Sequence, residues 1–344
     1  MTPGRRRWLP AAGAFVLVAV ALPACGKDSP SILDHHGPEA RHVAGVWWLM
    51  FGLAAAVYVV VAGLVVIAIV RGRRTSTPAE DGAAVVRAGT DRRSESAFIW
   101  AGGIVAPVVI LAILAVVTVT TTRDVRRAQD GELQVEVTAK RWWWDVRYPE
   151  SGVATADEIH IPVGRPIDVV LRSDNVVHSF WVPQLAGKLD AVPGQTNHLR
   201  FQASTPGTYL GECAEYCGLQ HARMGFIVIA DAPADFDRWL ARRSGAGTGP
   251  TSEATAEGQL VFMREACAGC HAIRNTQATA TLGPDLSDFG SRQWIGSVTL
   301  PNTRGNLAGW ISNSQTIKPG NLMPPISLEP DELDALVAYL ESLK

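Results

Sequence analysis

The residues most suited to chemistry lie in two short cysteine-containing segments of a 344-residue chain that has only five cysteines. The first segment, GECAEYCGLQHARMGF at 211–226, places Cys213 and Cys217 four residues apart and follows them with His221 and Met224. Thiolate, imidazole and thioether groups together are typical of copper electron-transfer sites. Zinc sites use cysteine and histidine but have little use for a thioether.

His178, in the upstream segment NVVHSFWVP, is a further potential ligand for the same site. The alternative for Cys213 and Cys217 is a disulfide, because compartments outside the cell membrane are oxidising. A disulfide between residues four apart would close a very small loop and constrain little of the unfolded chain. Two thiolates on one loop can instead bridge two copper ions, so the spacing favours a copper site.

The second segment, CAGCH, places Cys267 and Cys270 directly before His271. In this CxxCH pattern the two thiols attach covalently to haem vinyl groups and the histidine ligates the iron. A bare CxxC would also suit a redox or zinc site, but the adjoining histidine favours haem c.

Met323, in NLMPP, is the candidate for the second axial ligand of this haem, and His–Met ligation is expected of an electron carrier. Met263 lies only four residues before the motif and is expected to pack in the core. Residues 253–344 resemble a class I cytochrome c. That resemblance implies that the backbone carbonyl of Pro284, in LGPDL, orients the ring of His271.

The elements that must position these residues change in type along the chain. Residues 130–240 contain short alternating or apolar runs bounded by Gly and Pro, which predict an all-β antiparallel sandwich or barrel. Residues 241–252 are rich in Gly, Ser and Thr and are typical of a linker. Residues 253–344 predict an all-α unit whose last helix begins near Pro330 and Asp331.

Two long uncharged runs, at 44–70 and 97–122, precede the β region. Each is long enough to cross a bilayer as a helix, and Pro107 in the second run can be tolerated there. The intervening loop carries six arginines, so the positive-inside rule places it in the cytoplasm. The pattern predicts a transmembrane helix hairpin over 43–122 in a bacterial cell membrane, with both metal-binding domains on the outer side.

The N-terminus has a basic start followed by a short apolar run, which predicts a signal peptide over residues 1–24. LPAC at 22–25 resembles a lipobox, so cleavage before Cys25 and lipidation of its sulfur are expected. The alternative is an ordinary cleaved signal that happens to contain a cysteine.

The segments HSFWVPQLAGKLDAVPGQTN and PGTYLGECAEYCGLQHARMGFIVI resemble subunit II of the haem–copper cytochrome c oxidases. The layout of two membrane helices before the β domain does so too, and the resemblance covers roughly residues 40–240. It implies a cupredoxin-like domain with a dinuclear copper A centre. The implied ligands are two bridging thiolates, one imidazole on each ion, an axial thioether and a backbone carbonyl: Cys213, Cys217, His178, His221, Met224 and Glu215.

The same resemblance implies two further roles, and the sequence departs from the family pattern at one position. The Glu215 side chain would bind Mg²⁺ at the interface with subunit I, and Trp142, the first tryptophan of KRWWWDVRYPE, would be where electrons arrive. Many family members carry a glutamate three residues before a tryptophan, near a proton pathway. Here Ala97 has that spacing from Trp100, and the nearest carboxylate is Glu95. The alternative for Glu215 is a solvated loop carboxylate. For Trp142 it is packing in the core or at the membrane surface, and for Glu95 it is a juxtamembrane charge.

Together these features predict a subunit of a caa-type cytochrome-c oxidase, an oxidoreductase. The resemblance also implies that the complex is a proton translocase. Electrons from a quinol:cytochrome c reductase or a c-type cytochrome would pass from haem c to the copper pair and on to subunit I, which reduces O2. The chain has no histidine-rich helical bundle for an oxygen-reducing centre, so partner subunits are required. A net charge of −2 gives no reason to expect a nucleic-acid partner.

Two alternatives belong to other classes. One is the corresponding subunit of a nitric oxide or nitrous oxide reductase, since copper A sites occur in both settings. The paired helices and the fused haem domain favour an oxidase. The other is an envelope protein that handles copper, which would need exchangeable copper and no haem, so the CAGCH motif argues against it.

Overall fold

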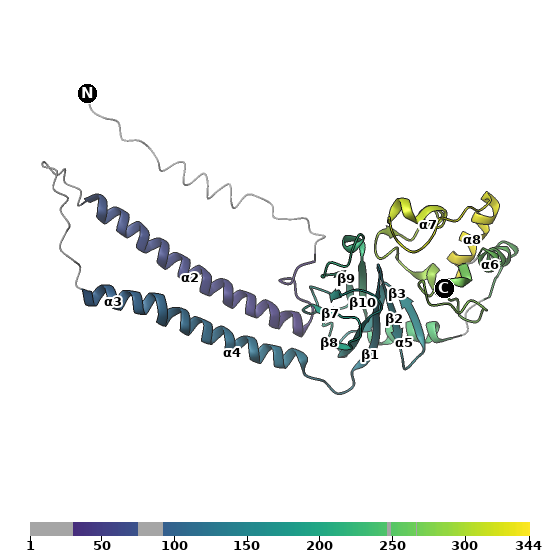
Figure 1. Ribbon diagram of the computed structural model, residues 1–344. Helices are drawn as coiled ribbons and strands as arrows, with labels where there is room; N and C mark the ends of the chain where they lie inside the picture. Colours follow the sequence, from purple (N-terminus) through teal and green to yellow (C-terminus); the bar gives the residue numbers. More distant parts are fainter. Residues whose placement is uncertain (1–29, 75–91, 246–248, 266) are drawn as a thin grey trace, which may run out of the picture.

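The computed structural model describes residues 30–74, 92–245, 249–265 and 267–344. They form a pair of long helices, a β-sandwich and a small helical domain, in that order along the chain (Figure 1). This order confirms the predicted fold class of a membrane helix pair, an all-β domain and an all-α domain. The predicted signal peptide, Cys25 and most of the arginine-rich loop lie outside the described residues.

The two apolar runs form long helices that lie side by side (Figure 1). The first is α2 (Pro38–Arg74), and the second is built from α3 (Arg92–Trp100), a π-helical turn (Ala101–Val105) and α4 (Ala106–Arg126). The segments long and apolar enough to cross a membrane are Pro38–Gly72 and Ser96–Val125. Their large apolar side chains are mostly exposed, as expected of surfaces that face lipid.

The π-helical turn in the second long helix lies directly before Pro107. A proline has no backbone N–H, and its ring clashes with the carbonyl four residues earlier, here that of Gly103. Widening the helix over Ala101–Val105 gives this carbonyl room, which is a common use of π turns. The sequence predicted a tolerated proline but not the change of helix type.

The N-terminal end of α2 is packed directly onto the β domain. The backbone N–H of Ala40 donates to the carbonyl of Leu185 at 3.2 Å, and the Glu39 carboxylate accepts the N–H of Gln202 at 3.1 Å. A Cβ atom at Gly37 would lie 2.4 Å from the carbonyl oxygen of Gln202, so only glycine fits there. The joint between helix and domain is therefore close-packed.

The β domain consists of two five-stranded sheets. One has the strand order β3-β2-β1-β5-β8 and the other β4-β10-β9-β6-β7. The strands are β1 (Leu133–Lys140), β2 (Trp143–Tyr148), β3 (Val153–Ala156), β4 (Glu158–Pro162), β5 (Ile167–Ser173), β6 (His178–Trp181), β7 (Leu189–Ala191), β8 (Asn197–Phe201), β9 (Gly207–Cys213) and β10 (Gly225–Asp231).

The expectation of a purely antiparallel sandwich was wrong in one respect. β1 pairs with β5, and β4 with β10, in parallel. Parallel neighbours need a long connection. Here the chain between β1 and β5 passes through β2, β3 and β4 before it returns. Alternation within each strand does not reveal which distant strand becomes its neighbour.

Aromatic side chains fill the space between the two sheets near the loop that carries Cys213 and Cys217. Phe180 and Phe226 stack with ring centroids 4.3 Å apart, and Trp144 meets both rings edge-on. A Cβ atom at Gly211 would lie 2.3 Å from the Phe226 ring. These packed rings give the metal-binding segments a rigid floor.

The helical domain follows α5 (Pro233–Ser244), which runs into the stretch whose composition predicts a linker. It contains α6 (Glu253–Arg264), the short helices η3 (Cys267–Gly269) and η4 (Phe289–Ser291), the strands β11 (Trp294–Ile295) and β12 (Leu300–Pro301), and the helices α7 (Arg304–Ile317) and α8 (Pro330–Ser342). α8 begins at Pro330, as predicted. Gly258 lets α6 approach α8 closely, because a Cβ atom there would lie 2.1 Å from the carbonyl oxygen of Ala335.

Candidate metal centre and haem site

Strand pairing brings His178 to the first cysteine pair. β6 begins at His178 and pairs with the end of β9, where Phe180 lies opposite Cys213. The Nδ1 atom of His178 lies 3.8 Å from the Cys213 sulfur, although 35 residues separate them in the chain. The donor atoms of His178, Cys213 and Cys217 all lie within 4.8 Å of one another, and the three residues are buried.

Cys217 is the centre of the remaining potential ligands. Its sulfur lies 3.8 Å from the Cys213 sulfur, from Nδ1 of His221 and from the Met224 sulfur. Both cysteines are free thiols, since a disulfide would require about 2 Å between the sulfurs. The backbone carbonyl of Glu215 lies 3.2 Å from the Cys213 sulfur. The six residues implied by the family resemblance thus converge on one site, in which His178, the two cysteines and Met224 are buried.

The electrostatics of the two thiols differ. Hydrogen bonding with the Cys217 thiol, and secondly with the His178 ring, holds the pKa of Cys213 well below the ordinary value of a thiol. The same partner and burial raise the pKa of Cys217. The thiolate of Cys213 therefore forms more readily than that of Cys217. A set of two thiols, two imidazoles and a thioether fits copper.

Hydrogen bonding and ring packing orient the His178 imidazole. Its Nε2 lies 3.2 Å from the Oδ1 atom of Asn175, which accepts the ring N–H and leaves Nδ1 free to bind a metal. Trp144 packs against the His178 ring with centroids 6.1 Å apart, and its indole N–H donates to the carbonyl of Met224 at 3.4 Å.

The Glu215 carboxylate points away from the thiols. It lies 3.9 Å from the ammonium group of Lys188, and its side chain is 45% exposed. Such an exposed pair contributes little stability. The carboxylate is therefore accessible to a ligand or to a partner surface.

The CAGCH segment forms a tight turn in the helical domain. The amides of Cys270 and His271 both donate to the carbonyl of Cys267, at 3.1 and 2.9 Å. The His271 Nδ1–H donates to the carbonyl of Pro284 at 2.7 Å, which leaves Nε2 available for iron. Burial lowers the pKa of His271, so the ring is neutral, as a metal ligand must be. A Cβ atom at Gly283 would lie 2.6 Å from this ring.

Met323 lies on the segment between α7 and α8, held through its backbone. Its carbonyl accepts hydrogen bonds from the Ser314 hydroxyl at 2.9 Å and the Gln315 amide at 2.8 Å. Its N–H donates to the Asn321 side chain at 2.8 Å. Met263 packs against the apolar core of the domain, as expected. The chain thus offers thiols, an imidazole and a fixed methionine segment, a set that fits haem c.

Trp142 is buried where the β domain meets the helical domain. Its indole N–H donates to the backbone carbonyl of Cys217 at 3.0 Å. Its own carbonyl accepts hydrogen bonds from Lys318 at 2.7 Å and from Ser297 at 2.9 Å, both residues of the helical domain. Trp142 therefore contacts both domains. Glu95 belongs to α3, and its side chain lies outside what the structure describes.

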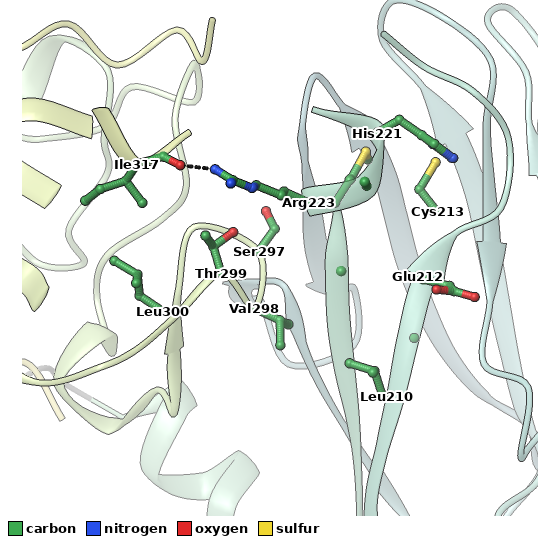
Figure 2. A pocket seen from close by; sticks show the side chains of 14 residues that line it. Leu210, Glu212, Cys213, His221, Arg223, Ser297, Val298, Thr299, Leu300 and Ile317 are labelled. Carbon is green, nitrogen blue, oxygen red and sulfur yellow. Dashed lines mark hydrogen bonds between the residues drawn. The ribbon is translucent and has the colours of Figure 1, made fainter. Parts of the chain in front are cut away.

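We call residues 213–224, which carry the two cysteines, the metal-binding loop. A cleft of about 730 Å³ opens between the two domains beside this loop (Figure 2). Cys213, His221 and Arg223 line it from the β domain, and the helical domain contributes Val298 and Ile317. The Arg223 guanidinium crosses the cleft and donates to the carbonyl of Ile317 (Figure 2).

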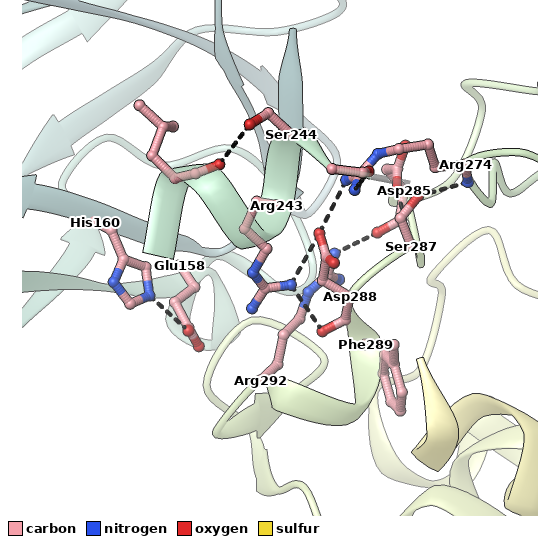
Figure 3. A network of polar contacts seen from close by, with 12 residues as sticks. Glu158, His160, Arg243, Ser244, Arg274, Asp285, Ser287, Asp288, Phe289 and Arg292 are labelled. Carbon is pink, nitrogen blue, oxygen red and sulfur yellow. Dashed lines mark hydrogen bonds and ion pairs between the residues drawn. The ribbon is translucent and has the colours of Figure 1, made fainter. Parts of the chain in front are cut away.

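A buried ion-pair network joins the domains on the side of α5 (Figure 3). Arg243 of α5 lies 2.8 Å from Asp288 of the helical domain, and Arg274 lies 3.2 Å from the same carboxylate. Beside it, His160 contacts the carboxylates of Glu158 at 3.1 Å and Asp231 at 2.8 Å. The Arg243–Asp288 pair and the contacts of Trp142 dock the helical domain onto the β domain, whereas the contacts of His160 lie within the β domain.

Relatives of known function match the chain over most of its length. "Cytochrome c oxidase subunit 2" of Alkalihalophilus pseudofirmus is 35% identical over 326 residues, which cover 93% of this chain and 92% of that protein. The chain belongs to the cytochrome c oxidase subunit II family. The protein of the same name from Bacillus sp. strain PS3 is 34% identical over 70% of this chain and 72% of its own length.

Two family models divide the outer part of this subunit II. "Cytochrome C oxidase subunit II, periplasmic domain" matches residues 150–231, and "Cytochrome c" matches residues 255–344. Copper A and haem c are the cofactors that these two families imply in general. The periplasmic domain of oxidase subunit II from Bradyrhizobium japonicum is 26% identical, covering 34% of this chain and 96% of that one, with a TM-score of 0.33. The chain is therefore a subunit of a cytochrome c oxidase.

Several residues around the two candidate sites escaped sequence reasoning. Asn175 lies three residues before His178, a spacing that carries no signal without knowledge of the turn. Gly283 stands in the LGPDL segment, and its closeness to His271 was available only as part of that motif. Ser297 and Lys318 form no motif, and only the docking of the two domains reveals them.

Proposed function

We propose that this chain receives electrons for a terminal oxidase, with covalent haem c as the first acceptor and a dinuclear copper A centre as the second. The observation that carries the proposal is the surroundings of Cys217, whose sulfur has three potential ligand atoms at 3.8 Å: those of Cys213, His221 and Met224. Two sulfurs so close, each beside its own imidazole, suit two ions that share both thiolates.

The residues that would hold the copper pair are Cys213, Cys217, His178, His221, Met224 and the carbonyl of Glu215. Those that would hold haem c are Cys267, Cys270, His271 and Met323. When bound, these groups supply reversible one-electron transfer from a c-type cytochrome or a quinol:cytochrome c reductase towards subunit I, where O2 is reduced. Asn175 and Pro284 would fix the two imidazole rings for this task.

Further proposed roles concern Glu215 and Trp142, which lie in or against the metal-binding loop, and the segments that anchor the chain in the membrane. The exposed Glu215 carboxylate would bind Mg²⁺ once subunit I covers it, because Mg²⁺ prefers carboxylate and water oxygens. Trp142 would receive electrons on their way to copper. The signal peptide, lipidated Cys25, the linker at 241–252 and placement of both domains outside a bacterial plasma membrane complete the proposal.

Metal analysis of the outer part of the chain, from Asp130 onward and matured with haem and copper, tests the proposal. Two copper ions and one haem iron per chain are expected, with a paramagnetic resonance signal from one electron shared by two copper nuclei. Cys217→Ser should abolish that signal and leave the haem in place. A single copper ion, or a Cys213–Cys217 disulfide without copper, would contradict the dinuclear assignment.

A further inference from the structure

Lys318 is a lysine buried at the junction of the two domains, only 3% exposed. It follows directly after α7, where a lysine usually extends into solvent near the negative end of the helix. Here its ammonium group donates to the carbonyl of Trp142 at 2.7 Å and to that of Gly296 at 3.1 Å. Lysine is almost never buried without such partners.

The acceptor of the shorter bond belongs to the other domain. Trp142 is itself bonded to the metal-binding loop, because its indole N–H donates to the backbone carbonyl of Cys217. The Trp142 ring also packs against that loop, since a Cβ atom at Gly218 would lie 3.2 Å from it. Any displacement of the Trp142 backbone therefore moves a residue in direct contact with the copper ligands.

Lys318 is equally well connected to the haem side. The side-chain amide of Asn321 donates to the Lys318 carbonyl at 2.7 Å, and its Oδ1 accepts the backbone N–H of Met323 at 2.8 Å. The side chain of Asn321 thus joins the backbone of Lys318 to the backbone of Met323, the proposed haem ligand. The geometry of segment 318–323 depends on where Lys318 is held.

Two side chains of the metal-binding loop donate hydrogen bonds to the residues on either side of Lys318. Arg223 donates to the carbonyl of Ile317, and the Gln220 side chain donates to that of Pro319 at 2.6 Å. Three consecutive residues, 317–319, are therefore bonded to the β domain, and Lys318 is the one whose side chain crosses into it.

The surrounding charges favour the ammonium form. Burial lowers the pKa of Lys318 to about 8, while the carboxylate of Asp157 acts in the opposite direction. The Ser297 hydroxyl links that carboxylate, at 3.1 Å, to the Trp142 carbonyl, at 2.9 Å. At neutral pH the bond from Lys318 to Trp142 is thus charge-assisted, and such bonds are shorter and stronger than neutral ones.

We propose that Lys318 is a positioning residue for electron transfer between the domains, because it fixes the segment that carries Met323 against the Trp142 backbone beside Cys217. The inference rests on the proposed function, in which electrons pass from haem c to copper. The balance of that transfer is one electron: the reduced haem is oxidised, the copper pair is reduced, and no bond or proton is exchanged. Electron tunnelling weakens steeply with separation, so loss of this contact slows the transfer.

The test compares Lys318→Met with the matched variant Lys140→Met in the intact oxidase. Lys140 also donates across the domain boundary, to the carbonyl of Thr281 at 3.0 Å, but not to Trp142. After flash reduction of haem c, its reoxidation should be about tenfold slower in Lys318→Met, the loss expected for one charge-assisted bond, and unchanged in Lys140→Met. Transfer from copper to subunit I should keep its rate in both variants.

Hydrogen exchange gives a second readout that does not depend on electron transfer. The backbone amides of Asn321 and Met323 should exchange faster in Lys318→Met than in Lys140→Met. Normal exchange and a normal rate in a Lys318→Met enzyme that holds both cofactors would overturn the proposal.

Two further outcomes are informative. If Lys318→Met does not retain haem or copper, the smaller change Ser297→Ala decides, because it removes the other donor to the Trp142 carbonyl. About threefold slowing is expected there, since a neutral hydrogen bond contributes less, and an unchanged rate overturns the proposal. If the unmodified enzyme itself shows no haem-to-copper transfer, the proposed function fails, and the exchange measurement still decides whether Lys318 holds the segment.

Discussion

The indole N–H of Trp142 donates a 3.0 Å hydrogen bond to the backbone carbonyl of Cys217, so an aromatic ring at the domain boundary is attached to the metal-binding loop. The bond joins residues 75 positions apart in the chain. Trp142 thus contacts the metal-binding loop through its indole N–H and the helical domain through its backbone carbonyl, which accepts from Lys318. Its removal has consequences that can be measured.

Trp142→Phe keeps a buried aromatic ring but removes the N–H donor and part of the π system. Transfer from haem c to copper should slow by about tenfold, equivalent to about 1.4 kcal/mol in the barrier. Flash-induced absorbance changes of both centres measure this rate. Trp143→Phe is the matched control, because Trp143 lies beneath Lys140 and away from Cys217. Equal rates in both variants would argue against a role for the Trp142 indole.

Asn175→Ala removes the acceptor that orients the His178 ring. Copper affinity should fall by about 10- to 100-fold, the usual effect of losing such a support. Competition with a copper chelator measures it. Asn197→Ala, which removes a hydrogen bond to the Asp190 carbonyl, controls for a general loss of stability. Unchanged retention of copper in Asn175→Ala would show that ring packing alone orients His178.

Arg243→Met breaks the buried ion pair with Asp288 and leaves that carboxylate with Arg274 alone. Removal of one partner of a buried pair costs about 3 kcal/mol of unfolding free energy. Denaturant unfolding followed by haem absorbance measures the loss. Arg238→Ala, on the same helix, breaks only an exposed pair with Asp235 and should cost less than about 1 kcal/mol. Similar costs for the two variants would contradict the structural role of Arg243.

Gly258→Ala places a Cβ atom where the backbone of Ala335 lies, so α6 and α8 must separate. The expected cost is about 1–3 kcal/mol, seen as a lower melting temperature of the haem domain. Gly309→Ala lies in α7, where a Cβ atom meets open space. Because alanine favours helix, this variant should be more stable by up to about 1 kcal/mol. A neutral Gly258→Ala would show that the helices can move apart freely.

His160 gives the β domain a pH-dependent contribution to stability. Burial lowers the pKa of His160, but hydrogen bonds to Asp231 and Glu158 outweigh it, and the pKa is raised above its ordinary 6.5. Burial raises the pKa of Glu158, but the hydrogen bond with His160 and its charge outweigh burial, and the pKa is lowered from 4.5. The Glu158 carboxylate is therefore ionised above pH 4.5. The contribution of protonated His160 is therefore complete between these two values and is lost as pH rises through the raised pKa.

The unfolding free energy of His160→Gln, compared with that of the unmodified domain, tests this sign. The difference should be largest between pH 4.5 and 6.5 and should shrink at higher pH. A difference that grows with pH would mean that the His160 ring is held neutral.

Most of the candidate copper site could be predicted from the sequence because its residues cluster in short motifs. Cys213, Cys217, His221 and Met224 lie within 12 consecutive residues, so only His178 had to be brought in by the fold. Alternation likewise predicted the β region, since it reports burial of one face. It did not predict the parallel pairing of β1 with β5, which depends on the order in which distant strands meet.

The contacts between the domains were not predictable in the same way. Lys318 follows a helical pattern, where a lysine is expected to face solvent, yet it is buried and donates to the Trp142 carbonyl of the other domain. Arg243 reads as part of a polar helix end, yet it is 8% exposed because Asp288 packs against it. Such residues are defined by complementarity between two surfaces, and periodicity within one segment carries no trace of it.

The close-packed joint at Gly37 and Ala40 has a mechanical consequence. Because α2 enters the β domain without a flexible tether, the tilt of the helix and the orientation of the copper loop change together. A membrane helix adjusts its tilt when the surrounding bilayer becomes thinner or thicker. We therefore expect lipid composition to change the alignment of the redox centres relative to the membrane. This coupling passes through Gly37, where no larger residue fits.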